Sequence, residues 1–194
     1  MAITLPLSVE DALEHLRLGG TADPAEYLEV ERMLQAAVQV ASDWTNRAWV
    51  VETRTASFDC FPVAPGYQKA CLYLDGGVVD SIASITYYDT DYAQQTLDAG
   101  SYRLVTGRGR SKVYPAMGQD WPTDSAEYEP EQIQVTYTVG SGTVPAPVVS
   151  AILLILGSLY EYREDGVIDN AGLALVKAPI AALDLLRPYK MRIA

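Results

Sequence analysis

The sequence is poor in the residues that catalytic and metal sites most often use. Its 194 residues include one histidine, His15, and two cysteines, Cys60 and Cys71. A Ser-His-Asp or Cys-His arrangement would need His15, and no nucleophile motif surrounds Ser8 or either cysteine. The cysteines have neither CxxC spacing nor a histidine cluster nearby, as a zinc site would require. We therefore predict a protein that is not an enzyme and uses no cofactor or metal, with His15 at a surface or an interface.

Long apolar segments are also missing. The longest run, residues 148–156, is interrupted by Ser150 and is far shorter than the roughly 20 residues that cross a bilayer. The N-terminal residues lack the basic segment and apolar core of a secretion signal. We expect a soluble protein without membrane contact, made in a reducing cytoplasm. There, free buried thiols are favoured over a cross-strand pair of Cys60 and Cys71.

Positive charge is scarce as well. Lys and Arg total 14 against 25 Asp and Glu, which gives a formal net charge of -11. A surface of this charge repels phosphates, so sequence-specific DNA binding is not expected. Two segments differ from the rest of the chain. Residues 187–194 hold Arg187, Lys190 and Arg192 and no acid, and the glycine-rich segment 107–110 holds Arg108 and Arg110.

Segment 107–110 has the glycines of a phosphate-binding loop, but it lacks both the Gly-Lys-Ser/Thr ending and a following helix. A hairpin tip between Val105 and Val113 explains it better. Arg108 and Arg110 are then candidates for contact with an acidic partner surface or with passing DNA.

Two acid pairs, Asp89 with Asp91 and Asp165 with Asp169, are the remaining candidates for a cation site or for acid–base chemistry. Neither has the glycine and glutamate spacing of an EF-hand, and neighbouring carboxylates are common in solvated loops. They leave one catalytic alternative open, a hydrolase that uses an acid pair.

Helical periodicity marks both ends of the chain. Ser8 and Asp11 form a capping pair at the start of a first helix. Asp23 caps a second helix, with Pro24 at its first position, and the apolar spacing extends to about Thr45. A third helix follows residues 145–147 and is apolar nearly all round, which predicts burial. Residues 169–177 form a loop or a short helix, and a last helix spans residues 179–186.

Between these helices the hydrophobic period changes to two. Short runs rich in β-branched and aromatic residues alternate with Gly, Pro and Asp turns, and residues 120–130 form a surface loop. The runs cover residues 50–58, 70–74, 79–88, 102–105, 112–114 and 133–139. Because the outer helices must bury their apolar stripes on one another, we predict an α+β fold. Its helical core comprises residues 1–47 and 146–194, two helices from each end, and a small antiparallel β unit is inserted at residues 48–145.

Three segments of the sequence carry a family resemblance. Residues 135–164, VTYTVGSGTVPAPVVSAILLILGSLYEYRE, join a strand to the apolar third helix, and they are accompanied by LSVEDALEHLRL at residues 7–18 and SITYYD at residues 84–89. Together they resemble the head–tail connector (adaptor) proteins of long-tailed bacteriophages, which have relatives in gene transfer agents. The resemblance also implies a helical core with a β-rich insertion between its second and third helices.

The resemblance implies a structural protein of the virion neck. Connectors of this family form a ring of about twelve copies beneath the portal and continue the DNA channel toward the tail. The expected partners are other copies of the chain, the portal protein and a downstream stopper or tail-terminator protein. DNA would pass through the lumen without sequence-specific binding, because about twelve copies would carry roughly -130 charges.

A ring of this kind requires a heterologous interface, for which the first helical pair and the third-helix region are the candidate faces. The tail would dock on the portal by charge and by apolar contact. Its candidate docking residues are Arg187, Tyr189, Lys190, Met191, Arg192 and Ile193. Two alternatives remain open: another neck or tail component, such as a tail terminator or completion ring, and a virion-associated hydrolase that uses Asp89 and Asp91.

Overall fold

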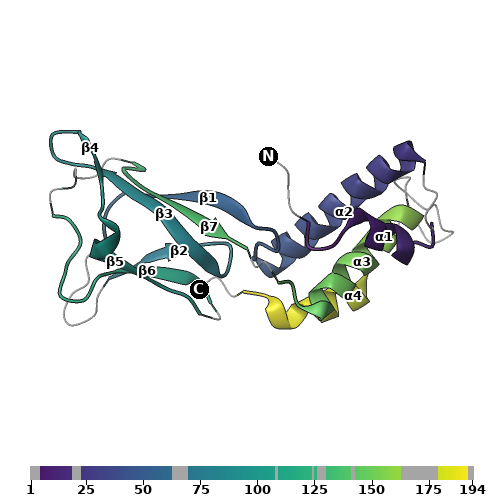
Figure 1. Cartoon of the computed structure of the whole chain (residues 1–194). Coiled ribbons are helices and arrows are strands. Elements are labelled where there is room, and N and C mark those ends of the chain that lie inside the picture. Colours follow the sequence, from purple (N-terminus) through teal and green to yellow (C-terminus); the bar gives the residue numbers. More distant parts are fainter. Residues whose placement is uncertain are drawn as a thin grey trace, which may run out of the picture. The chain divides into compact units, whose positions relative to one another are not determined.

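The computed structural model of the chain describes residues 5–18, 23–62, 70–107, 109–123, 125, 130–140, 143–162 and 179–191. These residues form two compact units (Figure 1). Met1–Val50 and Gly142–Lys190 make up the helical unit, and Val51–Ser141 make up the β unit, to which Met191–Ala194 are also assigned. The predicted α+β class is confirmed.

The first two helices of the helical unit begin where the sequence predicts. Helix α1, Val9–His15, starts with a capping box in which the Asp11 amide donates to Ser8 Oγ (3.1 Å) and the Ser8 amide donates to Asp11 Oδ2 (3.3 Å). Helix α2, Pro24–Thr45, ends at Asn46, whose φ of 53° places it in the left-handed region. Both helix starts therefore have a local sequence cause, although Asp23 caps α2 without a side-chain hydrogen bond.

Helix α3, Ala146–Glu161, packs against α2 and against α4, Ile180–Leu186. Pro145 lies at its N-cap, and its buried residues are Val148, Ala151, Ile152, Ile155 and Leu156. The prediction of burial all round is wrong at Leu154, which is 38% exposed, because the neighbouring helices cover only part of the surface of α3. The residues 169–177, predicted as loop or short helix, lie outside the described residues.

The β unit contains two antiparallel sheets. The four-stranded sheet has the order β1-β7-β3-β4, and the three-stranded sheet has the order β2-β6-β5. The strands are β1 Glu52–Phe58, β2 Leu72–Leu74, β3 Val79–Tyr88, β4 Gln94–Thr96, β5 Tyr102–Val105, β6 Ser111–Pro115 and β7 Ile133–Val139. Strand β7 is buried at every second residue, as its alternating sequence predicts.

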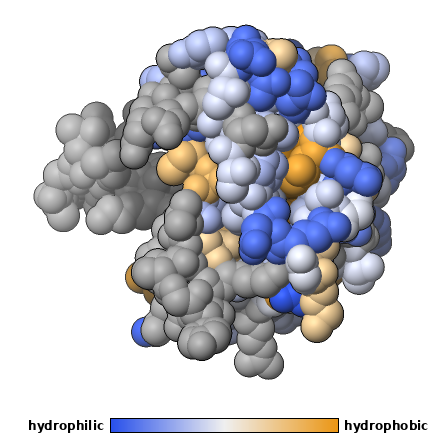
Figure 2. All heavy atoms as spheres, turned by 90° about the vertical axis from the view of Figure 1, so that its left-hand side faces the viewer, coloured by the Kyte–Doolittle hydropathy of each residue, from blue (hydrophilic) through white to orange (hydrophobic). Residues whose placement is uncertain are grey.

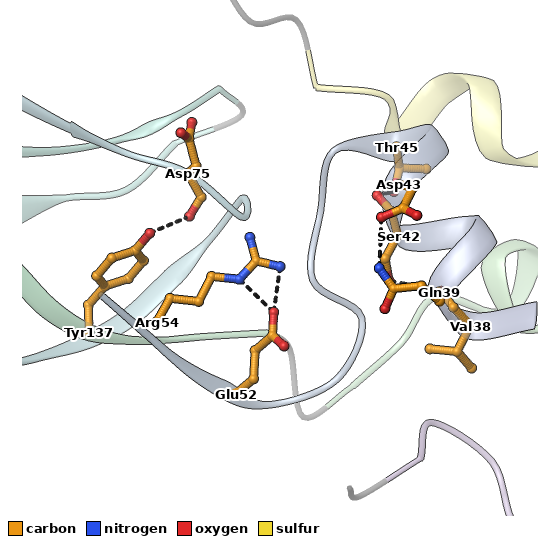
Figure 3. Close-up of polar contacts among 9 residues, drawn as sticks. All are labelled: Val38, Gln39, Ser42, Asp43, Thr45, Glu52, Arg54, Asp75 and Tyr137. Atoms are coloured by element: carbon orange, nitrogen blue, oxygen red, sulfur yellow. Dashed lines mark hydrogen bonds and ion pairs between the residues drawn. The ribbon is translucent and has the colours of Figure 1, made fainter. Parts of the chain in front are cut away.

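Polar contacts connect the strands and turns of the β unit (Figure 3). Tyr137 in β7 points toward Asp75 and its hydroxyl donates to the Asp75 backbone carbonyl (3.3 Å). Burial raises the pKa of Tyr137, which is 2% exposed. Ser111 in β6 donates to the Gly77 carbonyl (2.8 Å) and accepts from the Val79 amide (3.1 Å). These bonds tie the turn between β2 and β3 to β6 and β7.

Two details of the β unit differ from the sequence prediction. Trp121 does not lie in a free surface loop: its ring stacks on Phe61 at 5.1 Å between centroids, and its Nε1–H donates to the Ala70 carbonyl (3.1 Å). Cys60 and Cys71 are free, but Cys60 is exposed rather than buried because it follows the end of β1 in an open turn.

Candidate functional site

The C-terminal segment packs on the helical unit through aromatic contacts. After α4 the chain forms a 3-10 turn at Arg187–Tyr189. The Tyr189 ring meets the Trp49 ring edge-on, with 5.9 Å between centroids, and Lys190 Nζ lies 4.7 Å from the centre of the Trp44 ring. The segment is thus fixed against the C-terminal end of α2 and the residues that follow it.

Two consecutive buried hydrogen bonds fix the Trp49 ring that makes this contact. Thr45 is fully buried, and its hydroxyl donates to the Ala41 carbonyl (2.7 Å) while accepting from Trp49 Nε1–H (2.9 Å). Thr45 Oγ1 and Trp49 Nε1 are therefore both hydrogen-bonded, and the Trp49 ring is held in the orientation that Tyr189 meets.

The six predicted docking residues have different environments. Arg187 and Lys190 are exposed, Tyr189 is half-buried, and Met191 is buried at 2% exposure. Arg192 and Ile193 lie outside the described residues. The charged side chains of the described segment thus face solvent, whereas Tyr189 and Met191 already have contacts within the chain.

The predicted hairpin tip joins β5 to β6, which pair antiparallel. Arg110 makes an ion pair with Asp75, through Nε and Nη2 at 2.7 Å each from Oδ1. Arg108 lies outside the described residues. Arg110, a predicted contact residue, is thus paired with an acid of the same chain.

One face of the three-stranded sheet carries basic and tyrosine side chains, and we call it the basic tyrosine face. It consists of Tyr73 in β2, Arg103 in β5, Lys112 and Tyr114 in β6, and Arg110 beside the hairpin tip. Tyr73 lies directly opposite Lys112, and Arg103 lies directly opposite Tyr114, in the strand registers. Their neighbours along the strands, Leu72, Leu74 and Val113, are buried, so the alternation directs the face outward.

The cations on this face lie over the tyrosine rings. Arg110 and Lys112 lie 5.5 and 5.3 Å from the centre of the Tyr73 ring, and Arg103 lies 5.5 Å from that of Tyr114. The hydrogen bond between Tyr114 and Cys71 raises the pKa of Tyr114, with burial adding to the shift. Four residues of the face, all but Arg103, line an open depression of about 650 Å³ together with residues of the hairpin tip.

From the sequence alone, Arg110 is a candidate contact residue, whereas Arg103, Lys112 and the two tyrosines of the face are not recognised as a site. The signal was present, because Lys112 and Tyr114 flank Val113 in a strand of period two and must lie on the side opposite to it. What the sequence does not give is the pairing of β2, β5 and β6, which brings the separate outward residues together.

Asp89, the described candidate for acid–base chemistry, is engaged in local hydrogen bonds. Asp89 shapes its own turn: Oδ1 accepts from the Asp91 amide (3.0 Å) and the Ala93 amide (2.9 Å), and Oδ2 accepts from Gln95 Nε2 (2.7 Å). These bonds, with that from Gln95 the largest contribution, lower the pKa of Asp89. Asp165 and Asp169 lie outside the described residues.

His15 is exposed in the last turn of α1. Within the described ranges, no group of three or more His, Cys, Asp or Glu side chains is placed to hold a metal ion. No described helix has both the length and the hydropathy needed to cross a membrane.

Similarity to known proteins was found at the level of structure. No protein-family model matches the sequence, and no curated protein matches it significantly. A chain in the neck of an empty gene transfer agent (GTA) particle, computed with C6 symmetry, superimposes with a TM-score of 0.75 at 19% identity, over 100% of this chain and 94% of that one.

Two further solved structures are similar over the same extent. A chain of the virion of a native GTA particle gives a TM-score of 0.69 at 20% identity, covering 100% of this chain and 94% of that one. A chain of the neck of a native GTA particle, computed with C12 symmetry, gives 0.66 at 16% identity, covering 100% and 97%. The whole chain, with both its helical and its β unit, therefore has the fold of chains found in GTA particles.

Proposed function

We propose that this chain is a structural virion protein that forms the adaptor ring between portal and tail of a phage or GTA particle and continues the DNA channel. The observation that carries the proposal is the match over the whole chain to a component of a GTA neck, at a TM-score of 0.75. A shared helical unit alone would be weak support, since helical bundles recur with many functions. Here the inserted β unit and its position in the chain match as well.

The proposed ring contains about twelve copies of the chain. Closed rings of identical subunits use heterologous contacts, in which one face meets a different face of the next copy. At -11 per chain, the assembled ring is strongly acidic. Its lumen repels DNA phosphates, so the genome passes without sequence-specific binding. The space-filling view shows a face on which hydrophilic residues predominate and hydrophobic residues form small, separate patches (Figure 2).

The C-terminal tail is the proposed contact with the portal. Arg187 and Lys190 are exposed and basic, and Arg192 extends the same charge pattern in sequence. Tyr189 packs on Trp49, which holds the segment that carries Arg187 and Lys190 in place. We therefore assign charge recognition to the three basic residues and a supporting role to Tyr189 and Met191, with Ile193 left as an apolar contact.

The test is mass analysis of the purified chain alone and after mixing with the portal protein of the same particle, by light scattering and negative-stain imaging. The proposal predicts that a ring of about twelve forms on the portal. It is overturned if the chain stays monomeric with the portal and binds tail tube instead, which would assign it to another neck or tail component. Turnover of a substrate that depends on Asp89 would favour the hydrolase.

The tail is tested in the same assay with R187E/K190E/R192E. The matched control, R187K/K190R/R192K, exchanges the same residues and keeps their charge. The first variant should lose portal binding while the control retains it. Equal binding by both variants would refute the portal-binding role of the tail but not the proposed ring.

A further inference from the structure

The basic tyrosine face is an exception in the charge distribution of the β unit. Among the described residues, the ion pairs are Arg54 with Glu52 and Arg110 with Asp75. Arg103 and Lys112 belong to neither pair, and both lie on this face. The described carboxylates of the β unit outside these pairs are Asp59, Asp80, Asp89, Asp91, Asp98, Asp120 and Glu131. One basic face therefore belongs to a unit that is otherwise acidic.

The composition of this face is typical of a protein interface. Tyr and Arg are enriched at interfaces, and aromatic rings supply contact area at low entropic cost. Tyr73 is 45% exposed, with cations lying over its ring. The open depression beside it, about 650 Å³ in volume, offers space for side chains of a partner. The face is thus suited to contact an acidic surface.

A second copy of the chain offers such a surface. Its net charge is -11, so outside its own basic tyrosine face it presents an excess of carboxylates. Contact between a basic face on one copy and an acidic face on the next is heterologous, and repetition of such a contact can close a ring. Duplex DNA is less well matched, because Arg103 and Lys112 alone provide fewer phosphate contacts than the six to ten or so that a duplex-binding protein typically makes.

We propose that the basic tyrosine face is a subunit interface, in which Arg103 and Lys112 bind carboxylates on the β unit of the neighbouring copy. This inference rests on the ring proposed above and identifies a surface that forms it. It adds a contact between β units to the contacts expected of the helices. Arg110, already held by Asp75, orients the Tyr73 ring within the face rather than carrying free charge to the neighbour.

The experiment uses the full-length variant R103E/K112E in the portal-binding assay, with R103K/K112R as the control that keeps the charge. Negative-stain imaging scores closed rings, and scattering gives the assembled mass. We expect the wild type and the control to form rings. In the reversal variant the fraction of particles that are closed rings should fall at least about tenfold, because like charges then face each other. Thermal melting confirms that each variant is folded. If the reversal variant does not fold, R103Q/K112Q takes its place.

The outcomes separate this inference from the proposed function. If the wild type forms no ring, the ring itself is wrong. If the wild type and R103E/K112E form rings equally well, the ring stands and the proposed interface is refuted. If rings are normal but the wild-type chain retards duplex DNA at low salt and the reversal variant does not, the face binds DNA and this inference is likewise refuted.

Discussion

The buried hydrogen bond between Thr45 and Trp49 gives a prediction whose magnitude follows from the structure. In Thr45→Val a methyl group replaces the hydroxyl at nearly constant volume. The buried Trp49 Nε1–H, 2.9 Å from that hydroxyl in the native chain, then has no acceptor. An orphaned buried donor costs about 1–3 kcal/mol, so we expect T45V to lower the free energy of unfolding by about 2 kcal/mol.

A double-mutant cycle isolates this contribution. Trp49→Phe removes the donor together with part of the ring, so T45V/W49F leaves no buried N–H unpaired. The double variant should be about 1–2 kcal/mol more stable than the sum of the single effects predicts. Thr45→Ser is the matched control: it keeps the hydroxyl, loses one methyl, and should cost only about 1 kcal/mol.

The assay is urea denaturation followed by far-UV circular dichroism at 222 nm, where the helical unit dominates the signal. The slope of the transition must stay constant across the variants for the free energies to be compared. If T45V is as stable as the wild type, or if the two substitutions are additive, the hydrogen bond does not stabilise the segment that holds Tyr189. The reasoning would then be refuted.

Three further substitutions test other parts of the fold. Gly76→Ala should destabilise the chain by about 1–3 kcal/mol in urea, because φ is 92° and the new Cβ would lie 3.0 Å from Arg54 Nη1 and 3.3 Å from Val139 Cγ2; unchanged stability would contradict this turn geometry. Ile152→Ala, at a fully buried site in α3, should cost about 3 kcal/mol; a loss below about 1 kcal/mol would argue against the packing of α3. Asp89→Asn should lower the melting temperature at neutral pH. The pKa of Asp89 is lowered in the folded chain, so the ionised carboxylate stabilises the turn at pH values above 3.8, the ordinary pKa of an aspartate. The difference from the wild type should shrink as pH falls from 3.8 through the lowered pKa, and a difference independent of pH would refute the assigned role.

Much of the fold could be predicted because local signals agreed with the final structure. Helix α2 begins at Pro24 and ends at Thr45, as its cap and apolar spacing indicate. Strands β3, β5 and β7 have the predicted bounds, and burial alternates with period two along β5 and β7. In these segments, propensity, periodicity and turn chemistry all favour the same structure.

The missed features either lack a hydrophobic pattern or depend on contacts distant in sequence. Strand β4, Gln94–Thr96, is exposed throughout and has no hydrophobic pattern. It pairs with β3 because Asp89 closes the turn between them. The division into two sheets was likewise not predicted, since residues far apart along the chain form each sheet.

The candidate site was predictable only in part. The basic charge of the tail can be read from the sequence, but the contact of Tyr189 with Trp49 cannot, because it joins residues 140 positions apart. The same holds for the basic tyrosine face, where the register of β5 with β6 sets Arg103 beside Tyr114. The sequence shows the charge and type of each side chain, but tertiary contacts and strand register determine which side chains lie together.

The most direct test of the central claim is cryo-electron microscopy of the purified particle that carries this protein, with mass spectrometry to confirm that the chain is present. We expect a ring of about twelve copies between portal and tail, into whose density both the helical unit and the β unit fit. Absence of the chain from the particle, or its location in the tail tube or the capsid shell, would contradict the account.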